Sequence, residues 1–161
     1  MRTGFAFCGT VLIALVCVAA AWAVGPTREP LVIDPVTIEQ GVCPFPVTLE
    51  PVVNREIAKE FSDRLIITGR LVVRVTNEDT GESIVVNASG PATFVSDGEN
   101  ASVMYARGRG LLIFFPGDLG PDSDGSLLLA RGLVIERFSE GPLEVIRLPP
   151  NLTNLCDVLA S

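Results

Sequence analysis

The sequence predicts an all-β domain, either an antiparallel β-sandwich or a small β-barrel of about 8–10 short strands that ends in a short C-terminal helix. Two observations carry this prediction. Apolar and polar side chains alternate with a period of two over several stretches, and turn-forming residues recur about every 8–12 residues. Both patterns are typical of short antiparallel strands with one buried face.

Residues 1–23 are predicted to be a secretory signal peptide. Arg2 precedes an apolar run from Phe5 to Ala21, and the run ends in the small-residue motif Ala21-Trp22-Ala23. A basic start, an apolar centre and such a motif predict cleavage after Ala23. An uncleaved anchor is the alternative, because about 20 apolar residues suffice to span a bilayer. We therefore expect a secreted, extracellular protein, which an uncleaved segment would retain at the cell envelope.

The rest of the chain is predicted to form one unit. Residues 24–45 are an extended N-terminal segment rich in proline, which disfavours helix in the residue that precedes it. Residues 46–161 are a single β domain. The alternation is clearest in Arg70–Thr76, where Leu71, Val73 and Val75 share one face. A loop with Gly81 then joins this strand to a partner strand at Glu82–Ser89.

Further strands follow toward the C-terminus. They are expected at Ala92–Ser96, Ser102–Ala106, Leu111–Phe115, Leu127–Ala130 continuing toward Phe138, and Leu143–Leu148. Leu111–Phe115 is apolar on both faces, so it is either a central strand covered on both sides or a strand with one face on a cavity or partner. A short helix is expected at Asn151–Ala160, with Asn151 as its N-cap.

Two of the four cysteines, Cys43 and Cys156, lie outside the predicted signal peptide. Because exported proteins meet oxidising conditions, this pair is expected to form a disulfide. A reactive thiol is the alternative, but the sequence holds neither a histidine nor a Cys-x-x-Cys motif that would favour a thiolate.

Several motifs occur together in an order that resembles a group of small secreted proteins of high-GC actinobacteria. They are Asn77…Thr80-Gly81, Ser89-Gly90-Pro91, the run Gly110–Asp118, and Leu155-Cys156-Asp157. Members of that group also have a signal peptide, successive short strands and a cysteine near each end. The group has no established activity, so the resemblance implies architecture and export and transfers no catalytic residue.

Composition excludes several classes of function. The chain contains no histidine, which excludes a Ser-His-Asp triad, a Cys-His pair and a histidine-based zinc site. Its net charge of −7 disfavours binding to nucleic acid, because an acidic surface repels phosphate backbones. No cofactor-binding motif is present, and we predict no cofactor, no metal and no catalytic residue.

Three groups of charged residues are candidate sites. Three aspartates of the loop Pro116–Gly125, Asp118, Asp122 and Asp124, offer oxygen ligands for Ca²⁺, but the EF-hand spacing fails and a solvated turn is the preferred interpretation. Arg107 and Arg109, with Arg131, could hold an anion, but the preferred interpretation is that they offset acidic neighbours on the surface. Carboxylates that could serve in acid/base catalysis are plentiful, but solvated strand faces are the preferred explanation for them: Glu50, Glu56, Glu60, Asp63, Glu136 and Glu144.

The sequence favours an exported, non-enzymatic β domain that binds or interacts at the cell envelope or outside. A β-barrel that binds a small apolar ligand is the first alternative, and a carboxylate-dependent enzyme is the second. An apolar cavity would favour the first alternative, and carboxylates converging in a cleft would favour the second.

Overall fold

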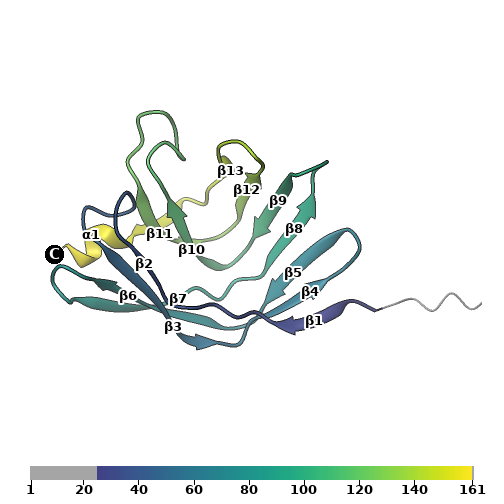
Figure 1. Cartoon of the computed structure of the whole chain (residues 1–161), viewed down its shortest axis with the longest axis horizontal. Helices are drawn as coiled ribbons and strands as arrows, with labels where there is room; N and C mark the ends of the chain where they lie inside the picture. Colours follow the sequence, from purple (N-terminus) through teal and green to yellow (C-terminus); the bar gives the residue numbers. More distant parts are fainter. Residues whose placement is uncertain (1–24, 161) are drawn as a thin grey trace, which may run out of the picture.

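The computed structural model describes residues 25–160, which form 14 β-strands and one short helix (Figure 1). The strands are β1 Thr27–Pro30, β2 Val36–Ile38, β3 Val47–Asn54, β4 Ile57–Glu60, β5 Arg64–Thr68, β6 Leu71–Asn77, β7 Ser83–Asn87, β8 Ala92–Ser96, β9 Ser102–Ala106, β10 Arg109–Phe114, β11 Ser126–Arg131, β12 Val134–Phe138, β13 Glu144–Arg147 and β14 Asn151–Asn154. The helix α1 spans Leu155–Leu159.

The described strands form three antiparallel sheets. The largest has the order β1-β4-β5-β8-β9-β12-β13, the second β2-β3-β6-β7 and the third β10-β11-β14. The arrangement is sandwich-like, and the sheets do not close into a barrel. The predicted all-β antiparallel class is therefore confirmed, and of its two forms the chain adopts the sandwich.

Long strands bend at short corners and pass from one sheet into another. The chain runs from β3 into β4 through Arg55 and Glu56, and it returns from β5 into β6 through Gly69 and Arg70. Two further pairs of strands bend in the same way: β9 continues into β10, and β11 continues into β12. Where these two segments bend, Gly132 N–H donates a hydrogen bond to the Gly108 carbonyl at 2.8 Å. Strands that change sheets at bends are the usual way to make corners in such sandwiches. These corners split long extended stretches, which is one reason the strand number exceeds the predicted 8–10.

Gly69 makes the first corner possible. Its φ is +153°, and a Cβ at this position would lie 2.2 Å from the Arg55 carbonyl oxygen and 2.5 Å from the Glu56 Cα. Both neighbours are backbone atoms, so they cannot swing away as the end of a side chain would. The close approach of the two crossing strands therefore requires a residue without a side chain.

We expect Gly69→Ala to lower the free energy of unfolding by about 1–3 kcal/mol, because the new methyl group forces the two crossing backbones apart. Urea denaturation of the two proteins measures this difference. Gly110→Ala is the matched control, since no atom lies within 4 Å of a Cβ there. Equal stability of Gly69→Ala and the parent protein would contradict this account of the corner.

Two hydrophobic cores lie on opposite faces of β10 and β11. Leu111, Ile113 and Leu129 face the first core, which also contains residues of β3, β6 and α1. Leu112 and Phe114 belong to the second core, together with residues of β9, β12 and β13. β10 is therefore covered on both faces, although it lies at the edge of its own sheet; Phe115, the last residue of the predicted strand, lies beyond β10 and is 48% exposed. The predicted pattern of β6 is confirmed as well, with Val73 and Val75 buried in the first core.

The Cys43–Cys156 disulfide is present and joins the beginning of the β domain to the C-terminal helix, with the two Cα atoms 5.4 Å apart. Cys156 lies in the first core. The helix is shorter than predicted and begins later, because Asn151–Asn154 pairs with β11 as a strand. Asn154 is the N-cap, where its side chain accepts a hydrogen bond from Cys156 N–H at 3.0 Å, so the prediction of Asn151 as the cap is wrong.

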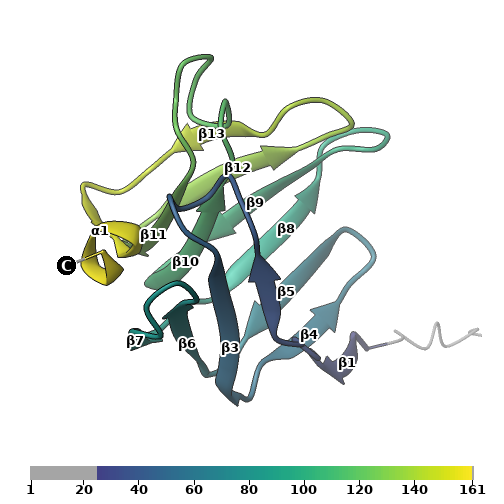
Figure 2. The same cartoon turned by 60° about the vertical axis from the view of Figure 1, so that its left-hand side comes forward.

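The proline-rich segment contributes two strands: β1 pairs with β4, and β2 pairs with β3. Figure 2 shows α1 beside β11, at the opposite end of the molecule from β1. The predicted signal peptide, residues 1–23, lies outside the described residues. No helix within residues 25–160 has the length and apolar character needed to cross a bilayer.

Candidate functional site

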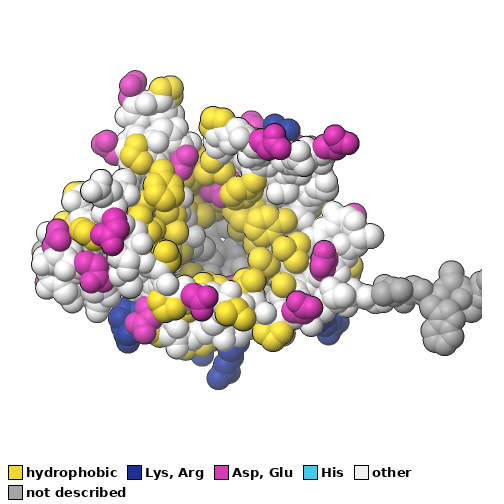
Figure 3. Space-filling model, in the orientation of Figure 1, with side chains coloured by type: hydrophobic (Ala, Val, Ile, Leu, Met, Phe, Trp, Pro, Cys, Tyr) yellow, Lys and Arg dark blue, Asp and Glu magenta, His cyan; other side chains and the backbone are white. Residues whose placement is uncertain are grey.

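A hollow opens near the middle of the face shown in Figure 3, and hydrophobic side chains surround it. Comparison with Figure 1, which has the same orientation, places this hollow between β10 and the hairpin of β8 and β9. Acidic side chains are also visible among the hydrophobic ones above it. The strand registers identify which residues face this side of the largest sheet.

Four residues form a row across the largest sheet, which we call the inner row: Leu65, Phe94, Met104 and Glu136. Leu65 of β5 is the register partner of Phe94 of β8, Phe94 is the partner of Met104 of β9, and Met104 is the partner of Glu136 of β12. Direct register partners in an antiparallel sheet point to the same face. Met104 packs against the second core, so the whole inner row faces the interior.

The hydrophobic packing ends partway along this face. Met104 and Ala106 of β9 pack against the second core, but their partners Phe94 and Ala92 on β8 belong to neither core. Leu65 and Ile67 on β5 also lie outside both cores and are only half-buried. The inward-facing apolar surface over β5 and β8 is therefore left incompletely covered by the described residues, which accounts for the apolar hollow.

Glu136 occupies the buried end of the inner row. Its side chain is only 5% exposed, and it shares its face of β12 with the buried Val134. Among residues 25–160 no hydrogen bond or ion pair to its carboxyl group is found, and its oxygens keep a small solvent-accessible area. Burial raises the pKa of Glu136 above its ordinary value of 4.5, and the negative charge of Asp118 raises it further.

This buried carboxyl group makes stability depend on pH. Because its pKa is higher in the folded chain than in the unfolded one, the folded state binds more protons, and stability falls as pH rises from about 4.5 through the raised folded value. We expect Glu136→Gln to be more stable than the parent protein at neutral pH and to lose less stability over that window. Melting temperatures between pH 4 and pH 8 measure this. Glu60→Gln on the exposed end of β4 is the control, and parallel profiles for all three proteins would contradict the prediction.

Glu136 also corrects an interpretation made from sequence. Its charge suggested a solvated strand face, as for Glu144, yet the two side chains lie on opposite faces: Glu136 pairs with Val145, and Glu144 pairs with Arg137. Glu56 is likewise buried, at the corner between β3 and β4, and burial raises its pKa. The sequence did carry one signal that Glu136 is buried. It is two residues from both Val134 and Phe138, so the three side chains lie on the same face of the strand.

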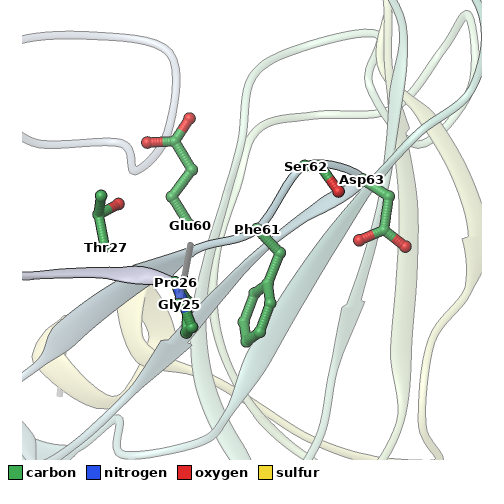
Figure 4. A pocket seen from close by; sticks show the side chains of 7 residues that line it. All are labelled: Gly25, Pro26, Thr27, Glu60, Phe61, Ser62 and Asp63. Carbon is green, nitrogen blue, oxygen red and sulfur yellow. The ribbon is translucent and has the colours of Figure 1, made fainter. Parts of the chain in front are cut away.

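The remaining carboxylates are spread over the molecule. Glu50 forms an ion pair with Arg74 across β3 and β6, and Glu144 lies 3.6 Å from Arg137. Glu60 and Asp63 line a pocket of about 420 Å³ beside β1, and Figure 4 shows their carboxyl groups pointing in opposite directions. These four side chains do not converge as a catalytic acid and base would.

The loop Pro116–Gly125 is closed by its own hydrogen bonds. Asp118 accepts from Phe115 N–H at 2.7 Å, and the Ser123 hydroxyl donates to the Gly120 carbonyl at 2.8 Å. Asp124 lines a separate pocket beside the disulfide. No group of three or more potential metal-ligating side chains occurs within the described part of the chain. Asp118 thus has a role in fixing the loop and in the electrostatics of Glu136.

Of the three arginines, two face each other directly. Arg109 of β10 is the register partner of Arg131 of β11, and both are exposed, as is Arg107. None of the three forms a salt bridge within residues 25–160. Like charges in register repel each other, so this pair is a local cost to the sheet.

Comparison with protein-family models, with curated proteins and with solved structures finds no match to this chain. The features available for inferring function are therefore the apolar hollow, the buried Glu136 and the disulfide. Sequence reasoning singled out Glu136 but not the inner row around it, because nothing in the sequence showed which strands are neighbours.

Proposed function

We propose that the protein is an exported, non-enzymatic binding domain that takes a small apolar ligand into the hollow over β5 and β8. The observation that carries this proposal is the inward-facing set of apolar side chains that neither core covers. Concave apolar surfaces with few polar groups are the usual form of small-molecule sites. In this proposal the ligand lies in the open interior of a sandwich, whereas the sequence suggested a β-barrel for such a ligand.

Export and the extracellular location belong to the same proposal. The disulfide is consistent with an oxidising compartment, and the sequence of residues 1–23 has the pattern of a signal peptide. Expression of the full chain in a secreting host tests this step. Mass spectrometry of the secreted protein is expected to find Val24 as the first residue, and a protein that stays inside the cell at full length would contradict it.

Binding is tested with the neutral fluorescent probe N-phenylnaphthylamine, whose emission rises in apolar surroundings. We expect Ala92→Phe to weaken probe binding by at least about tenfold, because the ring fills the hollow from the inner face of β8. Thr93→Phe is the matched control: it adds the same bulk on the opposite face of the same strand and is expected to leave the affinity unchanged.

A second variant separates loss of the site from loss of the fold. Phe94→Ala removes a lining ring without adding bulk, and it is also expected to weaken binding, with circular dichroism confirming that the fold is kept. A parent protein that does not bind the probe would overturn the proposal, as would equal affinities for Ala92→Phe and Thr93→Phe.

A further inference from the structure

The inner row combines an apolar surface with one buried acid. Glu136 is 5% exposed and lies in the same row as Met104, Phe94 and Leu65, so it faces the interior that the hollow opens into. No hydrogen bond or ion pair to its carboxyl group is found within residues 25–160, and its oxygens keep a small solvent-accessible area, because the fully buried side-chain oxygen without a partner in this part of the chain is Ser126 Oγ. A nearly buried carboxyl group with no partner in the protein is available to accept hydrogen bonds from a ligand in the hollow that it faces.

The charge around Glu136 indicates which chemical group of a ligand would bind to it. Asp118, on the loop after β10, is close enough for its negative charge to act on Glu136. The negative charges of Glu136 and Asp118 favour a cation at the Glu136 end of the inner row and disfavour an anionic head group there. Donors with positive charge also make the stronger hydrogen bonds to a carboxylate.

From this geometry we infer that the natural ligand is an amphiphilic amine, with its apolar chain against Leu65 and Phe94 and its ammonium group bound to the Glu136 carboxylate. This inference rests on the proposed function, because it names the class of ligand for the same hollow. An alkylamine is cationic at neutral pH, as lysine is, so it supplies both the charge and the hydrogen-bond donors that Glu136 lacks.

Three probes of equal chain length test the inference: decylamine, decanol and decanoate. Each is titrated by calorimetry into the purified protein at neutral pH, below the concentration at which it aggregates. We expect decylamine to bind at least about tenfold more tightly than decanol, because a hydrogen bond to a charged group contributes more than one to a neutral group. Decanoate is expected to bind most weakly of the three.

The variant Glu136→Gln keeps the shape of the side chain and removes its charge. It is expected to reduce the preference for decylamine over decanol to less than about threefold while decanol still binds. Glu144→Gln is the matched control, because it removes a carboxylate from the opposite face of the same sheet and is expected to keep the preference.

The outcomes separate the two proposals. Equal affinity for decylamine and decanol, or an unchanged preference in Glu136→Gln, would overturn the amine assignment while the proposed apolar site stands. Tightest binding by decanoate would overturn it as well. Failure of all three probes and of N-phenylnaphthylamine to bind would overturn the proposed function itself.

Discussion

Loss of the Cys43–Cys156 disulfide is expected to lower the free energy of unfolding by about 4–5 kcal/mol. The two cysteines are separated by 113 residues, and the chain-entropy model assigns a stabilisation of this size to closing a loop of that length. Domains of this kind have a total stability of about 5–15 kcal/mol. The loss is therefore a large fraction of the total stability of such a domain.

Guanidinium denaturation of the double variant Cys43→Ala/Cys156→Ala measures this effect. Adding a reductant to the parent protein is expected to lower its stability to nearly the same value, whereas the reductant has no effect on the double variant. A stability within about 1 kcal/mol of the parent would show that the bond contributes far less than loop closure predicts.

Leu127→Ala is expected to destabilise the protein by about 2–5 kcal/mol. Leu127 of β11 is 0% exposed and lies in the first core, which joins the second sheet to the helix and the disulfide. Truncation leaves a cavity beside Leu127's neighbours. Strand pairing and the disulfide hold the surrounding backbone in place, so the cavity cannot close fully. The cost therefore includes both the lost burial of the side chain and the lost contacts of its neighbours.

Leu152→Ala is the matched control for this variant. Leu152 lies on the neighbouring strand β14 but is 37% exposed, and its truncation is expected to change the stability by no more than about 0.5–1 kcal/mol. Thermal and chemical denaturation of the two variants give the comparison. Equal losses in the two would mean that burial in the first core does not determine the cost.

The sequence predicted the local parts of this fold well, because those parts depend on neighbouring residues. The alternation of Leu71, Val73 and Val75 identifies a buried face, and β8 and β9 begin and end at the predicted residues. The helix cap was placed wrongly because Asn151 and Asn154 are equally suitable caps locally. Pairing of residues 151–154 with β11 decides between them, and that pairing is a long-range interaction.

The hollow depends on which strands pair with one another, and this pairing could not be predicted from the sequence. Leu65, Phe94 and Met104 become one surface only through three separate strand registers, and each residue alone resembles an ordinary core position. Glu136 appeared exposed because glutamate usually is, although its position in step with Val134 favoured the interior. The corners could not be predicted from the sequence either, because the chain is extended on both sides of Gly69.

The position of the disulfide also determines what a protease can release. Cys43 and Cys156 lie near the two ends of the β domain, so the bond makes a covalent ring of nearly all of it. One cut in an exposed turn within this ring, such as the turn at Asp97–Asn100 between β8 and β9, opens the ring but leaves both pieces attached to each other. The two pieces made by a single cut within this ring therefore stay joined, and they separate only when the bond is reduced or a second cut is made within the ring.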